Sequence, residues 1–401
     1  MAPIPRLRAY DGPALLSYGF RPFFLLAALQ AGLTILVWLP FVAGRLAVPT
    51  AFAPVDWHVH EMLFGYQSAA VGGFLLTAIP NWTGRLPVQG RPLLVLVLAW
   101  LAGRFAVSAS ASIGWPMAMV IDALFLTLLA GAAAREIVAG RNWRNLKVVA
   151  LIGLLLAANL AFHLEAGLTG SADFARRFAI AVVLMLVMLI AGRIVPSFTR
   201  NWLAQRGAGR MPVPFGIYDK AVLAISALTL AGWVIVPDNA ATGVALMLAA
   251  GLHLVRLARW AGDRTLRNPL LVILHVGYLF VPVGFALTAA ASCGLIAAAA
   301  GSHAWTAGAF GTLTLAVMSR ASLGHTGRAL IATPATQLCY GLVVIGTVAR
   351  LCSALGHGPA MLLHVAGLSW SLAFLVFASA YWRVLTGARI AARAASPAQR
   401  A

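Results

Sequence analysis

The stretch that decides the fold is residues 178–192, which read FAIAVVLMLVMLIAG and contain no charged side chain. The segment around it, residues 176–198, is long enough to cross a membrane, because a transmembrane helix needs about 20 residues. The sequence predicts twelve such spans, at 22–44, 58–80, 92–112, 115–134, 147–168, 176–198, 218–236, 240–260, 270–292, 300–320, 335–353 and 360–384. None alternates strictly between polar and apolar residues, as a transmembrane β-strand does. The predicted fold class is therefore an all-α integral membrane protein.

The composition supports this class. Of the 401 residues, 61% are apolar and only 10% are charged, whereas a soluble domain has about 25% charged residues. A water-soluble globular enzyme is excluded, and so is a disordered chain, which needs low hydrophobicity. The connecting loops are short, so we expect residues 1–401 to form a single polytopic membrane domain.

The basic residues predict the orientation in the membrane. If the chain starts in the cytoplasm, 24 of its 29 lysines and arginines fall on the cytoplasmic side, including Arg6, Arg8, Arg393 and Arg400 near the termini. Positive residues are retained on that side during insertion. Both termini are therefore predicted to be cytoplasmic. The net charge of +19 is then a signal of topology and of contact with anionic lipid, and not of nucleic-acid binding.

The nine histidines fall into two layers on this topology. Polar groups within a bilayer are costly, so those that occur there are candidates for function. The outer layer contains His58, His60, His163, His303, His357 and His364, and the inner layer contains His253, His275 and His325.

In the inner layer, His253 and His275 are predicted to lie at the same depth, roughly 10 Å from the cytoplasmic surface, on sequential helices. Two such imidazoles could ligate a haem iron from both sides, or hold copper. The alternative is that each is an interfacial histidine with a water or protein partner. His325 is predicted at or just outside the same surface.

In the outer layer, residues 57–62 read WHVHEM. His58 and His60 would point about 200° apart on a regular helix, so either His58 precedes the helix or the two histidines serve different partners. Glu61 could orient a ligating imidazole or relay protons. His303 opens the tenth span, and small residues follow it. We expect His163, His357 and His364 to be peripheral.

A few other charged groups lie at or inside helix ends. The arginines among them could pair with haem propionates or reach toward the membrane surface. This group comprises Arg21, Arg85, Arg104, Arg193 and Asp122.

Several stretches of the sequence are distinctive, and they are residues 19–24 (GFRPFF), 57–65 (WHVHEMLFG), 80–84 (PNWTG), 267–271 (RNPLL), 275–278 (HVGY), 303–308 (HAWTAG) and 318–328 (MSRASLGHTGR). These stretches resemble the NnrS family of bacterial membrane proteins. They occur in order along most of the chain. The resemblance implies a twelve-helix protein of the bacterial inner (cytoplasmic) membrane that is associated with haem b and copper and with nitric oxide in denitrification or nitrosative-stress defence.

The resemblance also carries over individual residues. His58, His60, His275, His303 and His325 match family motif histidines, and Glu61 matches as well; His253 lies outside these motifs. The favoured function is reduction of nitric oxide to nitrous oxide at a His-ligated metal centre, with quinol or another donor supplying electrons and with Glu61 and His60 as catalytic groups. The alternatives are a non-enzymatic haem–copper protein that senses or sequesters nitric oxide and, less favoured, a transporter.

Overall fold

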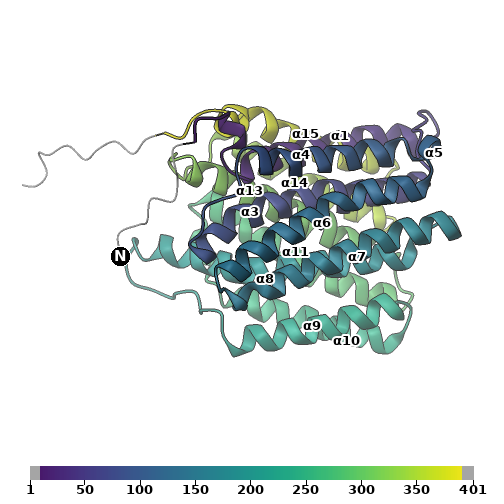
Figure 1. Ribbon diagram of the computed structural model, residues 1–401. Helices are drawn as coiled ribbons and strands as arrows, with labels where there is room; N and C mark the ends of the chain where they lie inside the picture. The colour runs from purple at the N-terminus through teal and green to yellow at the C-terminus, as the bar shows by residue number, and fades with distance from the viewer. Residues whose placement is uncertain (1–9, 391–401) are drawn as a thin grey trace, which may run out of the picture.

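The computed structural model describes residues 10–390, and every regular element in this part of the chain is helical. The helices run side by side along one direction (Figure 1). In chain order they are α1 (Phe20–Val42), α2 (Pro54–His60), the π-helix η2 (Glu61–Gln67), α3 (Ser68–Thr83), α4 (Arg91–Ser108), α5 (Ser110–Ile113), α6 (Trp115–Ala139), α7 (Leu146–Thr169), α8 (Asp173–Leu203), α9 (Ile217–Ile235), α10 (Ala240–Ala258), α11 (Pro269–Ser292), α12 (Ala298–His303), the π-helix η5 (Ala304–Gly311), α13 (Thr312–His325), α14 (Pro334–Ala354) and α15 (Met361–Thr386). Single 3-10 turns occupy Ala14–Leu16, Trp143–Asn145 and Gly262–Thr265.

Local sequence explains where several of these helices start and stop. The side chain of Asn268 accepts a hydrogen bond from the backbone N–H of Leu270 (3.1 Å) at the start of α11, and Pro269 occupies the first helical position. Proline is suited to that position because its missing N–H would have no partner there. Gly84 ends α3 in the left-handed conformation, with φ of 71°, which costs glycine little. Polar caps and glycine therefore set the ends of apolar segments.

Within residues 10–390, eleven helical segments are long and apolar enough to cross a membrane. They coincide with all the predicted spans except 300–320. That segment is occupied by α12, η5 and α13, a helical stretch that is less apolar because it contains His303 and several serines and threonines. It packs against α11 and α14. The all-helical class is thus confirmed for residues 10–390, with eleven candidate spans.

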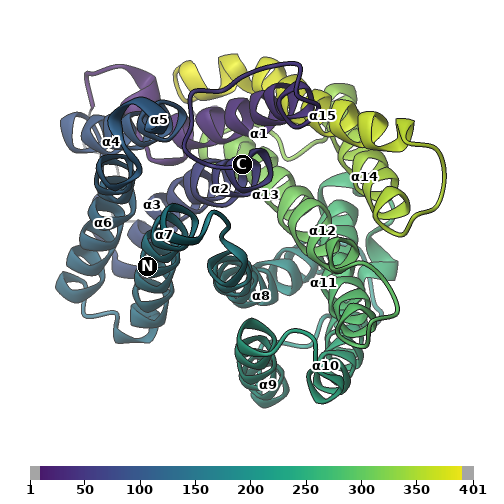
Figure 2. The same cartoon turned by 90° about the vertical axis from the view of Figure 1, so that its right-hand side faces the viewer.

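Viewed along their axes, the helices form an arc with α8 near its middle (Figure 2). Helix α8 packs against α7, α9 and α11, while α1 packs along α15 at the top of this view. Arg21 joins those two helices, because its Nη1 donates to the carbonyl oxygens of Leu385 (2.8 Å) and Gly387 (2.7 Å). The first helix therefore begins, and the last one ends, at the same end of the bundle. Arg6, Arg8, Arg393 and Arg400, which the orientation argument also uses, lie outside the described residues.

Two spans are much more enclosed by protein than the others. In the most apolar windows of Pro54–Thr83 and Asp173–Leu203, 83% and 72% of the residues are buried, against 61% or less in the other candidate spans. Pro54–Thr83 comprises α2, η2 and α3 and carries His58, His60 and Glu61. Of these three polar side chains, His60 and Glu61 are buried within the protein and His58 is half-buried.

Candidate functional site

A cluster of buried polar side chains surrounds His60, the last residue of α2. Its Nε2 lies 3.2 Å from Oδ2 of Asp122 on α6, and Nε2 of His163 on α7 lies 3.3 Å from the same oxygen. Asn159, one turn before His163, donates to that oxygen from Nδ2 (2.6 Å). All four side chains are at most 4% exposed. Three helices thus converge on one carboxylate oxygen.

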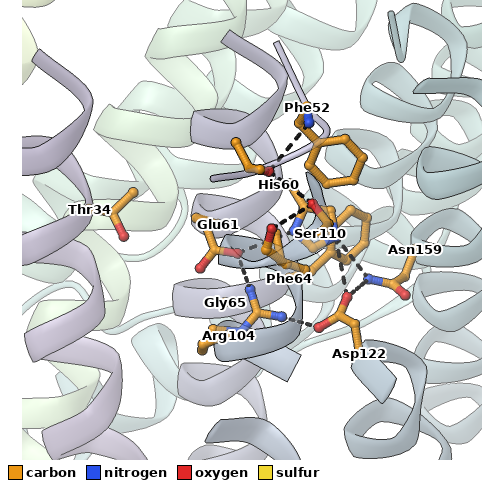
Figure 3. Close-up of polar contacts among 12 residues, drawn as sticks. Thr34, Phe52, His60, Glu61, Phe64, Gly65, Arg104, Ser110, Asp122 and Asn159 are labelled. Carbon is orange, nitrogen blue, oxygen red and sulfur yellow. Dashed lines mark hydrogen bonds and ion pairs between the residues drawn. The ribbon is translucent and has the colours of Figure 1, made fainter. Parts of the chain in front are cut away.

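Arg104 of α4 links this cluster to Glu61. Its Nη1 donates to Oε1 of Glu61 (2.6 Å), and its Nη2 donates to Oδ1 of Asp122. Figure 3 shows the guanidinium between the two carboxylates. The second oxygen of Glu61 accepts a hydrogen bond from Nε2 of Gln30 (2.5 Å). Glu61 is therefore held on both sides by neighbouring helices.

The arrangement of atoms around His60 and His163 suits a metal ion. Nε2 of each histidine and a carboxylate oxygen of Asp122 all lie within 4.8 Å of one another. Nδ1 of His60 lies 3.5 Å from Oε1 of Glu61, and a carboxylate at that nitrogen leaves the Nε2 lone pair facing the cluster. Two imidazoles and one carboxylate are ligands that iron, copper and zinc accept.

The charges in this cluster also suit a bound cation. Glu61 and Asp122 bring two negative charges, whereas Arg104 brings one positive charge. Buried charges are normally paired, so one further positive charge is needed here. Either a bound cation or a protonated histidine supplies it.

His58, two residues before His60, faces a different part of the molecule. Both residues lie in the regular helix α2, so their side chains point to different sides of that helix. The two histidines therefore have different partners, which is the second of the two alternatives that the sequence left open. The His58 ring stacks on Trp38 of α1, with centroids 4.4 Å apart and an interplanar angle of 28°. His58 and His60 therefore belong to two neighbouring sites.

His58 lines a cavity of about 340 Å³, which we call the outer cavity. His303, Arg176 and Arg350 also line it, together with aromatic side chains of α1, η2, η5 and α15. Nδ1 of His303 lies 2.7 Å from the carbonyl oxygen of Ala299, to which only a protonated nitrogen can donate. Nε2 of His303 therefore keeps its lone pair, as a metal ligand must. The structure thus brings together two histidines that the sequence assigned to metal binding.

Several buried polar atoms at the outer cavity have no hydrogen-bond partner within residues 10–390. They are Nδ1 of His58, Nε1 of Trp38 and both amide atoms of Gln67. Leaving a buried polar group unpaired costs about 1–3 kcal/mol. Such groups in a cavity indicate a site built to receive a ligand with polar atoms and an aromatic or apolar body.

Two π-helices line the same cavity. One begins directly after His60 and the other directly after His303, and Tyr66, Gln67, Thr306 and Phe310 of these segments face the outer cavity. A π-helical turn inserts an extra residue into a helix and is frequent at functional sites. In both segments it follows the histidine that opens the span.

The two inner-layer histidines have separate surroundings. His253 lies between Ser226 Oγ and Tyr278 Oη, each 2.9 Å from a ring nitrogen. Nε2 of His275 lies 3.0 Å from Oγ1 of Thr199, and its Nδ1 has no partner among the described residues. Neither residue lines either of the two described cavities. The predicted bis-histidine pair is not assembled in this structure.

His325, Arg21 and Arg85 lie elsewhere. His325 lines a second cavity at the other end of the bundle. Arg21 binds the end of α15, as described above, and Nε of Arg85 is 2.5 Å from Oε2 of Glu136. Arg21 and Arg85, two of the arginines considered as propionate partners, therefore bind other groups of the protein, whereas Arg176 and Arg350 line the outer cavity.

Sequence reasoning missed the role of His163, which we expected to be peripheral. A signal was present, because Asn159 and His163 are four residues apart in an apolar span and therefore share one helix face. Arg104 and Asp122 were recognised as charges within spans, but their mutual contact was not. His357 and His364 are exposed, in keeping with a peripheral position.

Comparison with known proteins gives the family. Among proteins of curated function, none matches this chain. The family described as NnrS protein matches residues 14–389, which is nearly the whole sequence. His60 and His303, which directly precede the two π-helices, lie within this match. The chain belongs to the NnrS family.

Proposed function

We propose that this protein binds haem and a second metal ion in a bacterial inner membrane and reduces nitric oxide to nitrous oxide. The observation that carries the proposal is the outer cavity, where His58 and His303 face a space with unpaired buried polar groups. The buried His60–Asp122–His163 cluster begins two residues along the same helix. Family membership supports a role with nitric oxide.

The residues present fit both groups. Either His58 or His303 would hold haem iron in the outer cavity, while the other leaves room for nitric oxide to bind. Arg350 would be available to the haem carboxylates, since arginine pairs with carboxylates in a bidentate way, whereas Arg176, which also lines the cavity, is paired with Asp173. His60, Asp122 and His163 would hold the second metal, for which copper is the implied candidate. Haem iron supplies an electrophilic site that binds nitric oxide and exchanges electrons.

The balanced reaction consumes two nitric oxide molecules, two electrons and two protons, and it yields nitrous oxide and water. A quinol in the membrane would donate the electrons. Glu61 is the group that would carry protons, because its carboxylate touches Nδ1 of His60 and is held by Gln30 and Arg104. Glu61 follows His58 by three residues, nearly one helical turn, and its neighbour Met62 lines the outer cavity.

We also propose twelve spans with both termini in the cytoplasm. The chain enters and leaves the bundle at the same end, and this requires an even number of crossings. Eleven helices qualify by length and composition, and the stretch of α12, η5 and α13 supplies the twelfth. Cysteines placed at Arg91 and Arg45 should label from the cytoplasmic and the outer side, respectively. Labelling of both from one side would contradict the topology.

The decisive experiment is the absorption spectrum of the purified full-length protein, oxidised and dithionite-reduced, with and without nitric oxide. We expect a Soret band that shifts on addition of nitric oxide, and its loss in whichever of the His58→Ala and His303→Ala variants lacks the iron ligand. The exposed His357→Ala variant is the control and should keep the band. Folded protein supplied with haem but lacking a Soret band would overturn the haem assignment.

Turnover separates the enzyme from a sensor. With excess reductant, an enzyme forms many equivalents of nitrous oxide per protein, whereas a sensor binds nitric oxide stoichiometrically and forms none. A Glu61→Gln variant should keep the nitric oxide-induced spectral shift and lose turnover. Unchanged turnover in that variant would remove Glu61 from the proton path.

A further inference from the structure

A second cavity, of about 450 Å³, lies at the opposite end of the bundle and is called here the inner cavity. The side chains of Phe24, Phe74, Leu189 and Ile194 give it apolar walls. Asn81, Trp82, Arg193, Arg320 and His325 give it polar groups, and Trp82 and His325 lie at the C-terminal ends of α3 and α13. This is the end of the bundle that the positive residues place at the cytoplasmic surface.

The inner cavity carries positive charge without a carboxylate to balance it. Arg193 donates to the amide oxygen of Asn145 (3.2 Å) and lies over the Phe215 ring, and Arg320 lies over the Phe198 ring. No ion pair to either arginine occurs within residues 10–390, and no acidic residue lines the cavity.

Further positive charges lie around Arg193. Arg144 and Lys147 are close enough to Arg193 to repel it electrostatically, and Lys220 is close to Lys147. Arg193 contacts an amide oxygen and an aromatic ring, and Arg320 contacts an aromatic ring. The positive charges of these guanidinium groups are therefore not balanced by a negative charge within residues 10–390, and Arg193 also lies near other cations. An anion in the inner cavity would relieve this repulsion.

We propose that the inner cavity binds the headgroup of an acidic phospholipid. Basic pockets between helices on the cytoplasmic side of a membrane protein are suited to anionic headgroups. The phosphate would lie between Arg193 and Arg320, and an acyl chain would follow the apolar wall formed by Phe24, Phe74 and Ile194. Trp82 lies at the depth where tryptophan rings meet lipid headgroups.

The position of this cavity gives the lipid a structural consequence. Helix α1 and the segments 54–83, 173–203 and 298–325 each contribute residues to both the inner and the outer cavity. A lipid bound at the inner cavity would therefore contact four segments that also shape the outer one. This inference does not depend on haem or on nitric oxide chemistry.

The test is thermal unfolding of the full-length protein in a non-ionic detergent with added lipid. A ligand that binds the folded state raises the melting temperature, so palmitoyl-oleoyl phosphatidylglycerol should raise it and phosphatidylcholine should not. In the Arg193→Gln/Arg320→Gln variant, we expect roughly thirty-fold more phosphatidylglycerol to be needed for the same shift, because two charged contacts are lost. The Arg91→Gln/Arg267→Gln variant removes two exposed charges at the same end and should respond like the wild type.

Other outcomes overturn the proposal. An equal shift in all three proteins would mean a general surface effect of anionic lipid. An equal shift with inorganic phosphate or glycerol 3-phosphate would assign the cavity to a free anion. If the glutamine variant does not fold, the Arg193→Lys/Arg320→Lys variant keeps the charge, and native mass spectrometry should then detect one retained acidic lipid per chain. Absence of a retained lipid in both the wild type and this variant would contradict the inference.

Discussion

Two buried clusters in this protein contain the same kinds of side chain but differ in how completely they are paired. One surrounds Arg104 between α2, α4, α6 and α7, and the other surrounds Arg256 on α10. Each contains an arginine, an aspartate and a histidine that are nearly or fully buried. The comparison separates a polar network that only stabilises the fold from one that can bind a ligand.

The Arg256 cluster is nearly closed, and only Nη2 of Arg256 is buried there without a hydrogen-bond partner within residues 10–390. Nε of Arg256 donates to Asp219 (2.8 Å), and its Nη1 donates to the hydroxyl of Tyr278 (2.7 Å). The Tyr278 hydroxyl can then donate to Nδ1 of His253, whose Nε2 donates to Ser226; the Ser226 hydroxyl donates to Val222 O. This order of donors leaves His253 neutral and without a free lone pair. One arginine also balances one carboxylate.

The Arg104 cluster is open. It contains two carboxylates and one arginine, and Nε2 of both His60 and His163 point toward the same oxygen of Asp122. It also adjoins the helix that lines the outer cavity. The difference teaches that an excess of carboxylate over arginine, together with two ring nitrogens that converge on one carboxylate oxygen, marks the candidate for cation binding, whereas burial alone does not.

The largest effect that we predict is on stability at the closed cluster. Arg256→Met leaves Asp219 buried without its ion-pair partner, which costs about 3–5 kcal/mol. The melting temperature in detergent should fall strongly, while metal and haem content per folded protein stays unchanged. A loss of bound metal in folded Arg256→Met protein would show that the two clusters are not distinct in function.

Removal of one carboxylate from each cluster should distinguish most directly between a metal-binding and a stabilising role. Asp122→Asn removes a metal ligand but also relieves the excess negative charge, so we expect metal affinity to fall on the order of 100-fold or more with little loss of stability. Asp219→Asn is the matched control, in which stability should fall and metal content should not. Elemental analysis and thermal unfolding of both variants provide the measurement, and the opposite pattern would reverse the assignment.

The sequence was sufficient for the fold because apolar length and charge placement are local properties. Runs such as residues 178–192 and the distribution of arginines required no knowledge of tertiary contacts. The span near 300–320 was harder, because the polar side chains that lower its hydropathy belong to the wall of the outer cavity. Its π-helix, like the one after His60, depends on packing and leaves no periodic signal.

The site was predicted only in part, for a physical reason. Sequence placed His58, His60, Glu61 and His303 in one layer, but depth along a helix axis says nothing about which way a side chain points. His253 and His275 were predicted to lie at the same depth, but they have different hydrogen-bond partners. His163 required knowledge that α7 lies beside α2 and α6, which only the assembled bundle provides.

Histidine substitutions should give intermediate effects that again differ between the clusters. His253→Ala breaks hydrogen bonds to Ser226 and Tyr278, and at about 1 kcal/mol for each bond we expect a stability loss of about 2 kcal/mol together with the cost of a small cavity. Metal content should not change. His163→Ala should lose the metal and leave the melting temperature of the metal-free protein nearly unchanged. Equal stability losses in both metal-free variants would mean that the hydrogen bonds of the Arg104 cluster stabilise the fold as much as those of the Arg256 cluster do.

The smallest predicted change concerns Gln67, whose buried amide has no partner within the described residues and faces the outer cavity. Gln67→Leu keeps a similar volume and removes two unpaired polar atoms, so ligand-free protein should become more stable by about 1 kcal/mol. If the amide serves a bound ligand, the same variant should bind haem or nitric oxide more weakly, as titration of the Soret band would report.

Thr288→Val is the control, because its buried hydroxyl is also unpartnered but lies outside both cavities. It should gain stability without any effect on binding. If Gln67→Leu is more stable and binds the ligand as well as the wild type does, the amide contributes nothing to the site. If the variant is more stable but binds the ligand more weakly, Gln67 serves ligand binding at a cost in stability of the fold.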